Sequence, residues 1–185
     1  PRLQGAADEA IRIARWHEGS EILLGPVATQ ERFLAGVRKA QLIHFAGHAV
    51  TNPELPMLSF LVLAPGSGDS GVLAAHEIQN LDLSRTRLVV LAACSTATGE
   101  ISVGEGVLSL ARPFLAAGAS AVVASLWDVD DEASTSLLVA FHRLLASGML
   151  PAEALRSAQV EFLDTSEEMR RRPDVWAAFQ FIGGL

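Results

Sequence analysis

The chain has 185 residues, half of them apolar and about a fifth charged, which is the composition of a globular domain with a sizeable core. The formal net charge is −7, and no basic cluster is larger than Arg170-Arg171-Arg172, so we do not expect direct nucleic-acid binding. A single cysteine excludes an internal disulfide or a cysteine-based zinc site and favours a reducing, cytoplasmic setting. No apolar run has the roughly 20 residues of a membrane span, and no signal peptide is recognisable.

Apolar periodicity predicts strands that alternate with helices along the whole chain. The expected helices cover residues 3–17, 32–38 with Thr29 as N-cap, a short segment from Ala74, 105–117, 131–147 with Asp130 as cap, and 151–164. The expected strands cover residues 21–25, 40–49, 58–65, 87–93, 120–127 and 176–184. Strands that are apolar on both faces indicate a mostly parallel α/β sheet with helices on both faces. We expect one domain over residues 1–185, cut from a longer protein.

Two of these strands are expected to end in a chemically versatile residue. His48 follows "LIHFAG", and Cys94, the only cysteine, follows "LVVLAA". If the two strands are neighbours, both residues project from one edge of the sheet, where an imidazole can activate a thiolate nucleophile. The alternative is that Cys94 is a small buried hydrophobe that belongs to the core.

The other histidines give no strong signal. His44 and His48 form H-x-x-x-H, but that spacing suits zinc on a helix and not on a strand, so no metal site is expected. His44 is expected to be a core histidine that is hydrogen-bonded to backbone. His17 and His142 fall on expected helices, and His76 is expected on the surface.

Two further motifs could indicate a function. "GSGDSG" (residues 66–71) matches G-x-G-x-x-G, but Asp69 would repel a phosphate, so we expect a loop and not a nucleotide site. No G-x-S-x-G is present, which argues against a serine hydrolase. Asp130 and Asp131 suit a helix start, whereas Asp128 is left at the same edge as His48 and Cys94, where it could select a cationic substrate group.

Taken together, the motifs resemble the CHAT domain, a caspase-like peptidase family commonly fused to tetratricopeptide repeats. The resemblance begins near Ile22 and is carried, in order, by "LIHFAGHA", "LSFLVLAP", "GVLAAHEIQNLDL", "LVVLAACSTATGE", "GEGVLSLARPFLAAGASAVVASLWDVDDEAS", "PAEALRSAQVEFL" and "WAAFQFIG". It implies the caspase–haemoglobinase fold and a catalytic Cys–His dyad. The matching positions are His48 and Cys94, 46 residues apart, close to the caspase-type spacing of about 50.

The sequence departs from the family pattern at two positions. The family usually has Gly directly after the histidine, whose N–H helps to form the oxyanion hole; here Ala49 keeps the N–H but cannot cheaply adopt a positive φ. The residue after the cysteine is often Glu, and here Ser95 leaves the substrate preference open.

The resemblance implies a cysteine endopeptidase without a cofactor, acting on a protein or peptide substrate. Cys94 would attack, His48 would move the proton, the backbone of Ala49 and Cys94 would hold the oxyanion, and Asp128 and Ser95 would line the substrate pocket. An upstream repeat or regulatory domain is the expected partner, and no membrane association is expected. The alternatives are a catalytically silent CHAT module that regulates a partner, which Ala49 favours, and a flavodoxin-like ligand binder.

Overall fold

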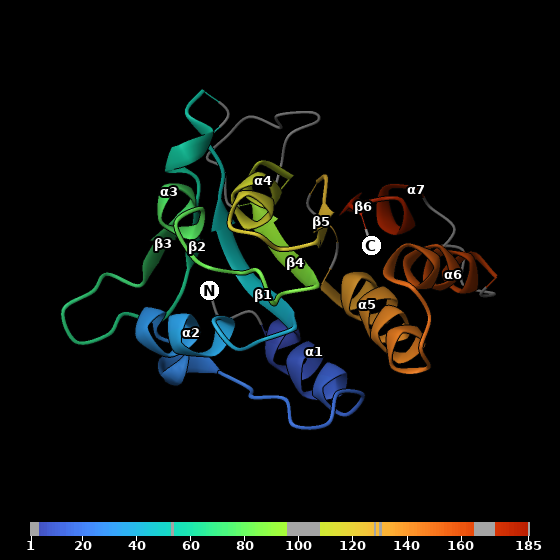
Figure 1. Cartoon of the computed structure of the whole chain (residues 1–185). Helices are drawn as coiled ribbons and strands as arrows, with labels where there is room; N and C mark the ends of the chain where they lie inside the picture. Colours follow the sequence, from blue (N-terminus) through green and yellow to red (C-terminus); the bar gives the residue numbers. More distant parts are fainter. Residues whose placement is uncertain are drawn as a thin grey trace.

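The computed structural model describes residues 4–52, 54–95, 108–127, 129, 131–164 and 173–184, and it shows one six-stranded sheet with helices on both faces (Figure 1). The strand order is β3-β2-β1-β4-β5-β6. The strands are β1 (Leu42–Val50), β2 (Phe60–Val62), β3 (Val72–Ala74), β4 (Leu88–Ser95), β5 (Ala121–Ser125) and β6 (Phe179–Gly183).

The centre of the sheet is parallel and its two sides are antiparallel. β1 pairs in parallel with β4, and β4 pairs in parallel with β5. β2 runs antiparallel to β1 and to β3, and β6 runs antiparallel to β5. The expected α/β sheet is therefore confirmed, with its parallel part confined to the three central strands that carry the candidate site.

Helices of both the α and the 3₁₀ kind connect the strands. They are α1 (Gln4–Ala14), η1 (Gly25–Val27), α2 (Gln30–Val37), η2 (Pro56–Leu58), α3 (Ala75–Ile78), α4 (Leu108–Ala116), α5 (Asp131–Ala146), α6 (Pro151–Leu163) and α7 (Pro173–Trp176). Within the described part of the chain, no helix has the length and hydropathy needed to cross a bilayer.

The sheet separates two hydrophobic clusters, because successive side chains of a strand point to opposite faces. One cluster contains Phe33 of α2 and Phe114 of α4. The other contains Ile13 of α1, Phe141 of α5 and Leu155 of α6. We call these faces the α2/α4 face and the α1/α5 face.

Most of the expected elements form. Thr29 caps α2 as predicted, with its side-chain oxygen accepting a hydrogen bond from the N–H of Arg32, and Pro151 begins α6. The expected strand at residues 21–25 is wrong, because residues 21–24 are irregular and Gly25 begins η1. Within the described residues this apolar segment pairs with no strand; it lines a groove of about 1210 Å³ beside β1, between α1 and α2.

Candidate functional site

The parallel pairing of β1 and β4 brings the two strand-end residues together. The register places His48 opposite Cys94 and Ala49 opposite Ser95. Neighbouring strands are about 4.8 Å apart, so the backbones of the two residues lie side by side. His48 is half-buried, and on its other side it pairs with Val62 of β2.

Ala49 fits its position without backbone strain. No non-glycine residue has a positive φ in the described ranges, and Ala49 continues β1 as a fully buried member of the α2/α4 cluster. The positive φ that alanine could adopt only at a cost is therefore not required in the described conformation.

A side-chain hydrogen bond joins β5 to β4 next to Cys94. The hydroxyl of Ser125, at the end of β5, donates to the carbonyl oxygen of Ala93 at 3.3 Å. Ser125 is buried, so this bond satisfies a hydroxyl that would be costly to leave unpaired. Asp128 and Asp130, which sequence analysis singled out after this strand, lie outside the described residues.

A small hollow lies on the α1/α5 face next to the strand ends. Its volume is about 30 Å³, which gives room for about one or two water molecules but not for a large side chain. It is lined by residues that precede His48 and Cys94 and by polar groups of α1, β5 and α5: Gly5, Ala6, Glu9, Ala46, Gly47, Ala92, Ala93, Ser125, Val129, Ser134, Thr135 and Phe179.

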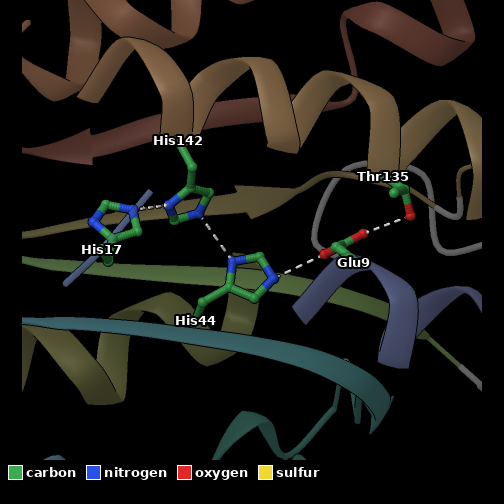
Figure 2. A network of polar contacts seen from close by, with 5 residues as sticks. All are labelled: Glu9, His17, His44, Thr135 and His142. Atoms are coloured by element: carbon green, nitrogen blue, oxygen red, sulfur yellow. Dashed lines mark hydrogen bonds and ion pairs between the residues drawn. The ribbon is translucent and has the colours of Figure 1, made fainter. Parts of the chain in front are cut away.

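Two residues that line this hollow, Glu9 and Thr135, belong to a largely buried network of five side chains, which Figure 2 shows. The Glu9 carboxylate accepts from Thr135 at 2.9 Å and lies 2.8 Å from Nε2 of His44. Nδ1 of His44 is 3.1 Å from Nε2 of His142, and Nδ1 of His142 is 2.8 Å from Nε2 of His17. We call these five residues the histidine network; they connect α1, β1 and α5, together with the turn after α1.

Burial within the network disfavours charge on two of its rings. The pKa of His142 is well below the ordinary value of 6.5, mainly because the ring is fully buried and further because of positive charge on His44 and His17. The pKa of His17 is lowered by its partial burial and by charge on His44. His142 is therefore neutral around pH 7.

Sequence reasoning missed this network. His44 was expected to bond to backbone, which is wrong, since its hydrogen bonds run to the Glu9 and His142 side chains. His142 was given no special role. A signal was present: Glu9 precedes the buried Ile13 by four residues, and His142 follows the buried Leu138 by four, so both lie on the apolar stripes of their helices. A buried carboxylate requires a partner, and His44 provides it.

Residues 66–71 and His76 have the local structure that the sequence predicts. Residues 66–71 form a loop in which the Asp69 carboxylate accepts from the N–H groups of Gly66 at 3.2 Å and Gly71 at 2.8 Å. These two donors are therefore engaged by the loop's own aspartate. His76 is exposed in α3, as expected. In the part of the chain that the structure describes, no group of three or more His, Cys, Asp or Glu residues is arranged to hold a metal ion.

The fold is that of a caspase-like α/β domain. The structure of gingipain R, an Arg-specific cysteine proteinase, superimposes with a TM-score of 0.64 and 12% identity, covering 98% of this chain and 41% of that one. The CHAT domain model matches residues 1–184, and the chain belongs to the CHAT domain family.

Curated relatives are much longer proteins. Tetratricopeptide repeat protein 28 of Homo sapiens is 30% identical over 217 aligned residues, and its Mus musculus counterpart is 29% identical over 219. Each alignment covers 98% of this chain but only 8% of the relative. The chain thus spans less than a tenth of the curated relatives that it matches.

Proposed function

We propose that this CHAT domain is a cysteine endopeptidase in which Cys94 is the nucleophile and His48 is the general base and acid. The observation that carries the proposal is the register of β1 and β4, which sets His48 beside Cys94 at the carboxyl ends of adjacent parallel strands. The caspase-like fold supports the same assignment.

The chemistry uses only groups of this chain and water. The Cys94 sulfur bonds to the scissile carbonyl carbon, and its proton passes to His48. His48 gives that proton to the leaving amine as the peptide C–N bond breaks, which leaves a thioester. Water then bonds to the thioester carbonyl carbon and gives one proton to His48. The C–S bond breaks, the acyl fragment leaves as a carboxylic acid, and His48 returns the proton to the Cys94 sulfur. The N–H groups of Ala49 and Cys94 hold the oxyanion in both steps.

Substrate preference is proposed to depend on Asp128 and Ser95. A carboxylate at residue 128, near the carboxyl end of β5, would favour a cationic residue before the scissile bond. The Arg specificity named for gingipain R motivates the same choice. The hollow beside Glu9 is too small for such a side chain, so the pocket is proposed to lie elsewhere at this sheet edge.

The wider setting is proposed from the relatives. Because they are named as tetratricopeptide repeat proteins, we propose that a repeat domain regulates this domain or presents substrate to it, in the cytoplasm. The proposal makes the substrate a protein or peptide and requires no cofactor.

The test is a peptide-library cleavage assay with Cys94→Ala and His48→Ala variants of the protein. Each variant should lose cleavage, whereas His76→Ala, which changes an exposed histidine on α3, should keep it. A library biased to Arg or Lys before the scissile bond should be cleaved best, and Asp128→Ala should reduce that bias. Cleavage that survives Cys94→Ala contradicts the proposed mechanism.

A thiol probe separates the peptidase from a catalytically silent module. Cys94 is the single cysteine, so labelling reports one site. A thiol activated by His48 should label fast near pH 7 and much more slowly in His48→Ala. Equal slow labelling of both proteins, with no cleavage, would favour the silent regulatory module.

A further inference from the structure

The histidine network has a single consistent arrangement of protons when its rings are neutral. An ionised Glu9 can only accept, so Nε2 of His44 carries a hydrogen and Nδ1 of His44 accepts. His142 must then donate from Nε2 and accept at Nδ1, and His17 must donate from Nε2. The second ring nitrogen of His17 points away from the network (Figure 2), and His17 is only half-buried.

This arrangement allows one proton to enter without any ring leaving its place. A proton from solvent binds to Nδ1 of His17, whose Nε2 proton passes to Nδ1 of His142. The Nε2 proton of His142 then passes to Nδ1 of His44. One proton has been taken up, His17 and His142 are again neutral with their hydrogens on Nδ1, and His44 is an imidazolium. Every hydrogen bond between the rings has reversed its direction.

The charge is best stabilised at His44 because, among the described side chains, that is the ring that a carboxylate contacts. Nε2 of His44 is 2.8 Å from Oε1 of Glu9, and both side chains are less than a tenth exposed, so their attraction is weakly screened. His142 has no carboxylate contact among its described hydrogen bonds, and its ring packs edge-on against Phe141.

Among the described residues, four ionisable side chains take part in the contacts of the three rings. They are Glu9 and His17 from α1 and the following turn, His44 from β1, and His142 from α5. β4 and β5 contribute apolar side chains to this face, Val90 and Val123 among them. Neighbouring charged residues on α1 and after it are exposed: Asp8, Arg12, Arg15 and Glu18.

We propose that the histidine network is a proton relay that admits one proton at His17 and stores it on His44 as an ion pair with Glu9. The stored proton couples solvent pH to the contact between α1 and β1 beneath the candidate site. His44 and His48 lie four residues apart on one strand and therefore on one face, about 13 Å along β1. The proposal does not depend on peptidase activity.

The test uses the full 185-residue chain with ¹⁵N-labelled histidine. It is titrated from pH 8 to pH 5, and NMR records the protonation state of each ring at each pH. The five histidines keep the spectrum assignable, and exposed His76 serves as an internal reference. We expect His44 to become doubly protonated while His142 stays neutral and its hydrogen moves from Nε2 to Nδ1. The relay is wrong if His142 keeps its Nε2 hydrogen throughout, or if His142 itself becomes charged while the fold persists.

Two variants sharpen the titration. Glu9→Gln removes the negative charge but keeps an acceptor oxygen, so His44 should stay neutral over the range in which the variant is folded. Thr135→Val removes the other partner of Glu9 and keeps the carboxylate, so the transfer of the hydrogen on His142 should persist. Titration of Glu9→Gln that matches the unmodified chain would also overturn the proposal.

Discussion

The two faces of the sheet are covered by helices in the same way but have different interiors. The α2/α4 face buries an apolar cluster that includes Phe33, Phe45 and Phe114. The α1/α5 face buries an apolar cluster as well, but it also holds Glu9 and His142, the two ionisable residues among the buried side chains described. The interior of the α2/α4 face is stabilised mainly by burial of apolar area, whereas that of the α1/α5 face also depends on protonation states.

The two faces are expected to differ in how well they tolerate substitution of a buried residue. An apolar contact on the α2/α4 face can be exchanged for another of similar volume. A residue of the histidine network cannot, because the loss of one member leaves its neighbours buried without a partner. Four substitutions or titrations test this contrast.

The largest effect is expected from Phe114→Ala on the α2/α4 face. Phe114 is fully buried, and its truncation should cost about 4 kcal/mol of unfolding free energy through lost burial and a cavity. Since no titratable group is involved, chemical denaturation at pH 6 and at pH 8 should give the same loss. A loss that changes between these pH values would break the contrast between the faces.

Glu9→Ala is the matching change on the α1/α5 face. It removes the acceptor of both His44 and Thr135 and should cost about 3 kcal/mol at pH 8. Unlike the Phe114 change, the loss should grow at pH 6, because a proton taken up by the histidines no longer has a counter-charge. A loss that is independent of pH would show that the network acts only through neutral hydrogen bonds.

Gly47→Ala tests how tightly the α2/α4 face is packed beside the candidate site. A Cβ at residue 47 would lie 2.8 Å from the Phe45 ring, which is itself buried and packs edge-on against Phe33, so the substitution should cost about 2 kcal/mol. Gly36→Ala in α2 is the control: nothing lies within 4 Å of its added Cβ, and alanine favours helix, so stability should rise slightly. Thermal unfolding of both variants measures these changes in stability.

The smallest effect is the pH dependence of the unmodified chain. His142 and His17 have lowered pKa values when folded, so near pH 6.5 and below the unfolded chain binds protons that the folded chain does not. These two rings therefore cost no folding stability above that pH, and stability falls as the pH drops below it, with a slope of at most about 1.4 kcal/mol per pH unit from buried His142 and only a small, solvent-screened addition from half-buried His17. Urea titrations at pH 8, 7, 6 and 5.5 measure the slope, and Phe114→Ala should retain it. A flat profile would contradict the buried neutral state of His142.

The sequence predicted the fold because its apolar patterns are strong and local. β4 and β5 are continuous apolar runs, and Thr29 and Pro151 mark helix starts by simple chemistry. Residues 21–25 have the same apolar character as a strand, but strand formation also requires a neighbour to pair with, which a local pattern cannot supply.

The candidate site was predictable in part for the same reason. His48 and Cys94 could be assigned to strand ends from local patterns, but their register is a long-range property that only the paired strands reveal. The histidine network was not predicted, since Glu9, His44 and His142 are far apart in the sequence and no spacing rule relates them. Whether residue 49 needs a positive φ, which alanine adopts only at a cost, could not be read from the sequence; the described backbone does not need it.

The shared register of β1 and β4 also limits which insertions this domain can tolerate. One residue added within 42–47 would carry His48 past Cys94 and turn its ring to the opposite face, together with every residue after it in the strand. The same residue added at 66–70, in the loop between β2 and β3, would leave the pairing of β1 with β4 unchanged. Length variation among homologous domains is therefore expected in such loops, while the two central strands keep a constant length.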